Sequence, residues 1–188
     1  MQIVKNIIRH WLPLAVLTFA FSGLVYLAVQ QDLRIGANDP QIQMAEDTAS
    51  AIAGGANPAS LVPSSDIEIA TSLAPFVIVF DETGNIIASS GLMHGKNLSL
   101  PAGVLDYVKA NGEDRITFQP QPGVRIAAVI VPVSGAKPGF VLAGRSLREV
   151  ENRIDQLNLQ VIAALLATLA VSLVVVALVE IVLGGRRT

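Results

Sequence analysis

The stretch that decides the fold is FVIVFDETGNIIASS, residues 76–90. Its first five residues, Phe76–Phe80, are aromatic or β-branched, which is typical of a buried strand. Asp81–Asn85 supplies turn chemistry, and Ile86–Ser89 returns as a second strand. The stretch therefore predicts a β-hairpin, and this hairpin is the first pair of strands in the expected sheet.

Three further strands are expected after the hairpin, separated by turns rich in Pro and Gly. They are predicted at 115–119, 124–131 and 139–143. Helices are predicted at 40–53, 66–73 and 101–110, with loops at 56–65 and 91–99. The predicted fold class is α+β, with a mostly antiparallel five-stranded sheet and flanking helices.

Two long stretches, Leu12–Val29 and Leu159–Val179, carry no charged residue. Each is long enough to cross a hydrocarbon core about 30 Å thick. The expected organisation is an N-terminus at 1–10, transmembrane helices at 11–30 and 159–183, an outer domain at 31–158 between them, and a tail at 184–188. A cleaved signal peptide is the alternative for the first stretch, and it is disfavoured because the apolar run continues well past the small residues Ala20–Ser22.

Charge sets the expected orientation. Lys5 and Arg9 precede the first span, and Arg186 and Arg187 follow the second. Positive flanks stay in the cytoplasm, so we expect a two-pass protein of the cytoplasmic membrane, with both termini inside and the middle domain outside. The middle segment is net negative, which disfavours nucleic acid as a partner.

The residue types give no sign of catalysis. The chain has no Cys and two His, and no His or carboxylate cluster has metal-ligand spacing. No Ser or Thr has a base placed beside it by a recognisable motif. We therefore expect no enzyme, no metal and no cofactor.

The last predicted helix begins near Ser146, because Ser146 and Glu149 have the spacing of a capping box. One continuous helix is expected from Leu147 to about Leu183. Apolar residues recur at three- and four-residue spacing at its start: Leu147, Val150, Ile154 and Leu157. Two interpretations of this seam stay open: a homodimer contact, or packing against the domain's own sheet or first helix.

Candidate ligand-binding residues come from three places. Arg125 shares a strand face with Ala127 and Val129, and an Arg there can bind a carboxylate or phosphate in a bidentate fork. The alternative is a structural ion pair or an exposed strand end. His94 and Lys96 lie in the loop after the hairpin, where plain solvation is the alternative. Tyr107 lies on the helix at 101–110 as a pocket or core aromatic.

Two stretches resemble a known family. Residues 76–90 resemble the strand-turn-strand of Cache and other PAS-like extracytoplasmic sensor domains. Residues 139–151 resemble the last strand and exit helix of such domains in bacterial histidine kinases. The resemblance covers about 33–157. It implies that the domain binds a small ligand outside the cell and signals through the second span.

Only about five residues follow the second span, so we expect the output to be a separate kinase or other membrane partner. The alternative function is a non-enzymatic docking or assembly subunit of a membrane complex, with no small-molecule ligand.

Overall fold

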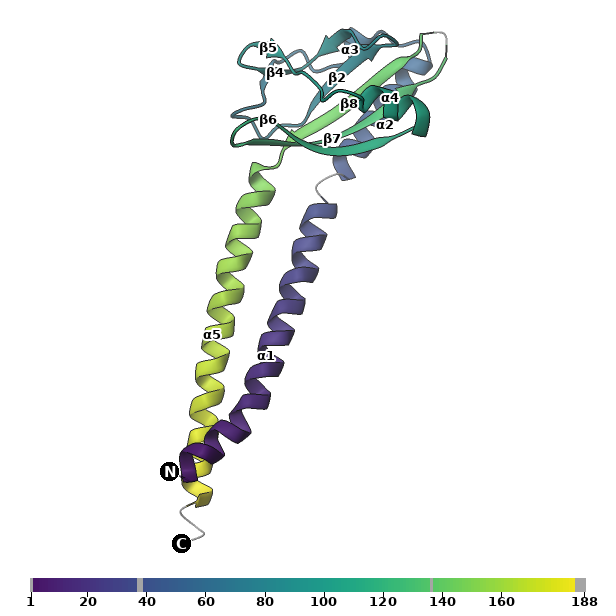
Figure 1. Ribbon diagram of the computed structural model, residues 1–188. Coiled ribbons are helices and arrows are strands. Elements are labelled where there is room, and N and C mark those ends of the chain that lie inside the picture. Colours follow the sequence, from purple (N-terminus) through teal and green to yellow (C-terminus); the bar gives the residue numbers. More distant parts are fainter. Residues whose placement is uncertain (1, 37–38, 136, 185–188) are drawn as a thin grey trace. The chain divides into compact units, whose positions relative to one another are not determined.

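The computed structural model describes residues 2–36, 39–135 and 137–184 (Figure 1). The chain divides into two compact units. The helical unit comprises residues 1–33 and 152–188, and the sheet unit comprises residues 34–151.

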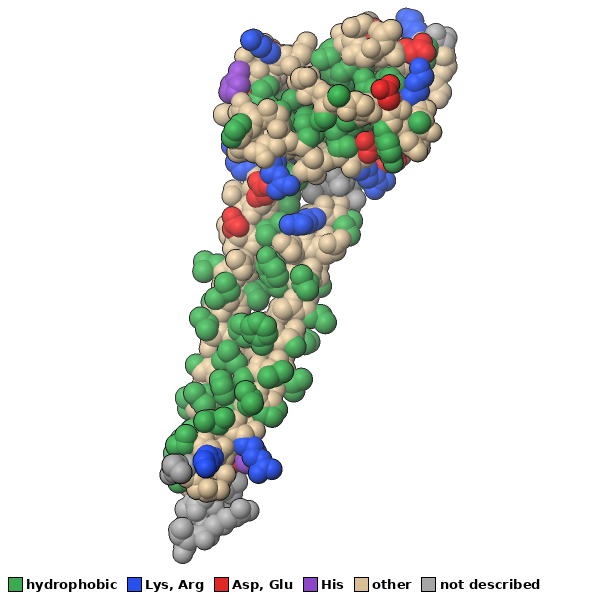
Figure 2. Space-filling view, in the orientation of Figure 1, with side chains coloured by type: hydrophobic (Ala, Val, Ile, Leu, Met, Phe, Trp, Pro, Cys, Tyr) green, Lys and Arg blue, Asp and Glu red, His purple; other side chains and the backbone are tan. Residues whose placement is uncertain are grey.

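The helical unit is built from α1 (Gln2–Ile35) and from all but the first turn of α5 (Arg148–Gly184). Both helices are long and apolar enough to cross a membrane, judged by length and composition. Figure 2 shows hydrophobic side chains exposed along both of them. The predicted continuous last helix is confirmed, whereas its passage through a membrane stays a prediction.

Polar contacts join the two helices. Nε1 of Trp11 donates to Oγ of Ser172 at 3.0 Å and to the carbonyl of Leu169 at 3.3 Å. Nδ1 of His10 lies 2.7 Å from Oε1 of Glu180. We call these contacts the helix clasp. In an apolar medium such hydrogen bonds have no water to compete with them, so they favour one register of α1 against α5.

The helix clasp can be tested by fluorescence, because Trp11 is the sole tryptophan. In the full chain in detergent, Ser172→Ala removes one acceptor from the indole N–H. We expect the emission maximum to shift to shorter wavelength. The control is Thr168→Ala, whose hydroxyl bonds the carbonyl of Ala164 in its own helix. Equal spectra for wild type and Ser172→Ala would contradict the clasp.

The sheet unit contains the five-stranded antiparallel sheet that the sequence predicts, in the order β3-β2-β8-β7-β6. Its strands are β2 (Phe76–Asp81), β3 (Ile86–Ser89), β6 (Asp114–Gln121), β7 (Val124–Val133) and β8 (Gly139–Ser146). Strand β8 is central, between β2 and β7, and leads directly to α5.

Each face of this sheet buries a separate apolar layer. On one face, α2 (Asp39–Ala53) packs against β7 and β8, and its small residues Ala45 and Ala49 permit a close approach. The other face is covered by α4 (Val104–Asn111) and by a small three-stranded sheet of order β1-β4-β5. The candidate site lies on this second face.

Several predicted elements were wrong. Residues 66–73 are not a helix, because Ile67–Glu68 forms strand β1 and pairs in parallel with β4 (Gly91–Met93). The expected loop at 91–99 contains β4 and β5 (Lys96–Asn97), and the loop at 56–65 contains the short helix α3 (Pro58–Leu61). Pairing between β1 and β4 joins segments distant in the chain, so local patterning does not reveal it.

The predicted capping role of Ser146 is confirmed in part, because its hydroxyl accepts a hydrogen bond from the first turn of α5. Ser146 is the last residue of β8, because the amide of Leu147 still donates to the carbonyl of Arg125 at 2.9 Å. Helix α5 starts at Arg148, whose amide donates to Oγ of Ser146 at 3.3 Å. Sheet pairing at the end of β8 therefore moves the helix start by one residue from the predicted Leu147, while Ser146 still accepts from the first helical amide.

Phe76 fixes the spacing between the two sheets. Its side chain is 1% exposed and lies against Gly144 of β8 and Gly91 of β4. A Cβ atom at Gly144 would lie 2.7 Å from the ring, and one at Gly91 would lie 2.5 Å from it. Only glycine at both positions leaves room for the ring in this position.

We predict that Gly144→Ala lowers the free energy of unfolding by about 1–3 kcal/mol, because the new methyl group overpacks the Phe76 ring. Chemical denaturation of the full chain measures the change. In the Phe76→Leu background, Gly144→Ala should lower the free energy of unfolding by less, because the smaller leucine side chain leaves room for the new methyl group. An equal loss of unfolding free energy in both backgrounds would show that the Phe76 ring does not clash with the new methyl group.

Candidate ligand-binding site

A groove of about 470 Å³ lies between two strand edges of the sheet unit. One wall comes from β4 and β5 of the small sheet, and the other from β6 of the large sheet. We call it the β5–β6 groove. It is lined by Met93, Lys96, Asn97, Leu98, Ser99, Leu100, Pro101, Phe118, Gln119 and Pro120.

The lining of the β5–β6 groove combines apolar and polar groups. Met93, Leu98, Leu100 and Phe118 pack against the core on this face of the sheet. Polar side chains come from Lys96, Asn97, Ser99 and Gln119. An apolar surface with a few polar groups, at a volume between about 300 and 1,000 Å³, is typical of a small-molecule site. Lys96 is the charged residue among those that line it, so the groove suits an anion.

A second hollow of about 470 Å³ lies on the other side of the segment Leu98–Pro101, which lines both. It is bordered by the β2–β3 turn at Thr83 and Gly84 and by the start of α4 at Leu105 and Asp106. Asp106 is its charged lining residue, and an Asp in the first turn of a helix also complements the helix dipole.

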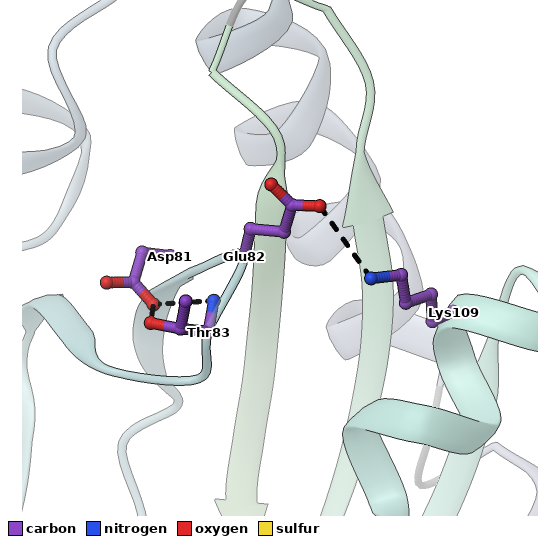
Figure 3. Close-up of polar contacts among 4 residues, drawn as sticks. All are labelled: Asp81, Glu82, Thr83 and Lys109. Atoms are coloured by element: carbon purple, nitrogen blue, oxygen red, sulfur yellow. Dashed lines mark hydrogen bonds and ion pairs between the residues drawn. The ribbon is translucent and has the colours of Figure 1, made fainter.

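The β2–β3 turn is held by Asp81. Oδ1 of Asp81 accepts from the amide and the hydroxyl of Thr83, at 2.9 and 2.7 Å (Figure 3). Asn85 donates to the same carboxylate, through its backbone amide at 2.8 Å and its side-chain amide at 3.0 Å. These bonds, with the Thr83 side chain first and the Asn85 side chain next, lower the pKa of Asp81 from 3.8 to about 2. Figure 3 also shows Glu82 reaching Nζ of Lys109 on α4, at 3.7 Å.

This pKa gives a pH prediction. Because the pKa of Asp81 is lower in the folded chain, its ionised form stabilises the fold above pH 3.8, and that stabilisation is lost as the pH falls toward 2. Asp81→Asn should lower the urea midpoint at pH 6, with a gap from wild type that closes between pH 3.8 and 2. Glu82→Gln is the matched control and should change the midpoint less, since its exposed ion pair contributes little. A difference in urea midpoint between wild type and Asp81→Asn that did not change with pH would contradict stabilisation by the ionised carboxylate.

The four predicted ligand residues do not form one site. Lys96 lines the β5–β6 groove. His94 lies at the adjacent β4–β5 turn, and its Nε2 is 2.8 Å from Oε1 of Gln121. Arg125, at the start of β7, pairs through its NH1 nitrogen with Oε1 of Glu151 at 2.8 Å, which is the structural ion pair that the sequence left open.

Tyr107 lies away from this groove. It is on α4 and 52% exposed, so the core interpretation was wrong; Val108, fully buried, takes the core position instead. Helix α4 precedes the end of β6 that pairs with Ile130, whereas Arg125 lies at the opposite end of β7.

Sequence reasoning missed most of the groove. Asn97, Ser99, Phe118 and Gln119 line it, and none was predicted as a ligand residue. The alternation of half-buried Ile116 and Phe118 with exposed Arg115 and Thr117 along β6 marks Phe118 as facing the core. The signal that was absent is the strand pairing of 91–97, which forms the opposite wall.

The predicted dimer seam is partly covered by the chain itself. Val150 is buried at 9% exposure, and Leu147, Ile154 and Leu157 are half-buried. Ile154 and Leu157 begin a stripe of half-buried residues at three- and four-residue spacing that reaches Leu169, Ser172 and Glu180, where the helix clasp meets α1. This favours packing within the chain, and the homodimer stays a prediction.

Within the parts of the chain that the structure describes, no group of three or more His, Cys, Asp or Glu could hold a metal ion. No protein-family model matches the chain, and no curated protein matches its sequence. One similar solved structure is the ligand-binding domain of the Pseudomonas aeruginosa PAO1 amino acid chemoreceptor PctC in complex with GABA. The identity is 16% and the TM-score is 0.43 over 72% of this chain, which spans 62% of that domain. Membership of the Cache or PAS-like family stays a prediction.

Proposed function

We propose that the protein is a membrane-anchored sensor module that binds a small anionic molecule in the β5–β6 groove. The observation that carries this proposal is the groove itself: an apolar surface, a polar rim and one cation, Lys96. The sheet unit would lie outside the cytoplasmic membrane, with both termini in the cytoplasm. The exposed apolar surfaces of α1 and α5 support membrane anchoring, and Lys5 and Arg9 before the first span support the orientation.

The proposed output is through α5 to a separate partner, a kinase or another membrane protein. Central strand β8 leads directly into α5, so a change at the sheet has a short covalent path to the helix. The helix clasp would couple α1 to that change, because its polar contacts join the two helices. We also propose that the module acts as a homodimer.

We predict that a small anion stabilises the full chain in detergent and that Lys96→Ala abolishes this effect. Succinate, L-glutamate and inorganic phosphate serve as probes, since Lys96 can pair with a carboxylate or a phosphate. Thermal unfolding followed by circular dichroism should show a saturable rise in Tm, because a ligand that binds only the folded state stabilises it.

Arg125→Ala is the matched control. It also removes one cation, yet Arg125 pairs with Glu151 and does not line the groove. Its response to the probes should equal that of the wild type. The anion site at Lys96 would be rejected if none of the three anions raised the Tm of the wild type. It would also be rejected if Lys96→Ala and Arg125→Ala lost the rise in Tm equally.

A docking or assembly subunit is the second candidate function. It is favoured by the Phe76 ring, which occupies the space between the two sheets at Gly91 and Gly144. A blank result with all probes would favour this function.

A further inference from the structure

The two walls of the β5–β6 groove differ in how firmly the backbone holds them. Strand β6 pairs with β7 from Asp114 to Phe118 and again at Gln121. Strand β5 is two residues long and lies at the edge of the small sheet, where it pairs with β4. Strands in globular proteins usually have about three to ten residues, so this pairing alone holds β5 weakly. The wall that carries Lys96 and Asn97 therefore depends on contacts outside its own strand.

A side-chain contact joins the two walls. Nε2 of His94, in the β4–β5 turn, lies 2.8 Å from Oε1 of Gln121, the last residue of β6. An amide oxygen can only accept, so the ring donates from Nε2. Gln121 is half-buried and its backbone is held by β7, so it is an anchored partner for the exposed ring. We call this contact the His94–Gln121 bridge.

The backbone of the β4–β5 turn is unusual at His94. His94 has φ 52° and Gly95 has φ 71°, and a positive φ at both residues is the pattern of a type I′ hairpin turn. The first position of such a turn is usually Asn, Asp or Gly. A positive φ is uncommon outside glycine and persists where surrounding contacts fix it. The His94–Gln121 bridge is such a contact, so it stabilises the turn as well as joining the walls.

The bridge stands beside the groove and not in it. Neither His94 nor Gln121 lines the groove. Each is adjacent in the chain to a residue that does, Met93 on one wall and Pro120 on the other. A change in the bridge therefore reaches both walls through one peptide bond on each side.

The polar side chains of the groove are left for a ligand. Within the described parts of the chain, no hydrogen bond or ion pair holds the side chains of Lys96, Asn97 and Gln119. We infer that His94 and Gln121 are positioning residues: their hydrogen bond holds the β4–β5 turn against β6 and sets the width of the groove. This inference rests on the proposed function, since it assigns the residues that shape the same anion site.

The test is a double-mutant cycle in the full chain in detergent, with Gln121→Ala, His94→Asn and the two combined. Asn tolerates a positive φ, so His94→Asn removes the ring without forcing the turn. Hydrogen exchange is measured on peptides that cover 91–97. We expect each single variant to raise exchange there about fivefold, the effect of one lost hydrogen bond, and the combined variant to raise it no further.

Two further variants serve as controls. Gln121→Glu keeps an oxygen that accepts from the ring, so exchange over 91–97 should stay near the wild-type level. Thr117→Ala changes an exposed side chain of β6 away from the turn and should leave this exchange unchanged. Peptides of β7 and β8 report on global unfolding. The inference would be overturned by additive effects in the combined variant, or by a rise over 91–97 no larger than the rise in β7 and β8.

Binding of succinate, L-glutamate and phosphate is measured on the wild type and on Gln121→Ala, which changes neither the charge nor a lining residue. We expect Gln121→Ala to weaken the affinity for the anion that binds the wild type. Unchanged affinity alongside faster exchange over 91–97 would overturn the role of the bridge in shaping the groove. If the wild type binds none of the anions, the proposed ligand site is rejected, while the exchange data still decide whether the bridge holds the turn.

Discussion

The ring of Phe76 lies between the backbones of Gly91 and Gly144, and the arrangement of the sheet unit depends on this contact. Phe76 belongs to β2, Gly144 to the neighbouring strand β8, and Gly91 to the small sheet. Because interiors are close-packed, the ring sets how near β4 can lie to the large sheet. The same contact fills the space between the sheets, so accessible volume on this face is found at the edges, in the β5–β6 groove and beside α4.

The groove is built from edges rather than from a central cavity. Strand β6 is the last strand of the large sheet, and β5 is the last strand of the small one. Edge strands present unpaired backbone groups, which a ligand can use together with nearby side chains. Such a wall needs support from elsewhere, because the two-residue strand β5 has few contacts of its own. The His94 ring in the β4–β5 turn provides one such support, because its Nε2 lies 2.8 Å from Oε1 of Gln121 on β6.

The helical unit follows different physics. Its apolar residues point outward along both helices, and hydrogen bonds such as those of Trp11 join α1 to α5. In an apolar solvent, exposed apolar side chains carry no hydrophobic cost. Polar contacts between helices then determine how the helices pair. His10 and Glu180, 2.7 Å apart, add a further polar contact to the same clasp.

The sequence by itself determined the features that depend on composition and local period. The apolar stretches Leu12–Val29 and Leu159–Val179 predicted two long helices, and residues 76–90 predicted the hairpin that starts a five-stranded sheet. It also marked Lys96 as a candidate ligand residue. Only the tertiary structure decided that Ile67–Glu68 is a strand, that Ser146 ends β8, and that Arg125 pairs with Glu151 while Lys96 faces a groove. These outcomes depend on contacts between residues far apart in the chain, and such contacts leave no periodic signal in the segments that make them.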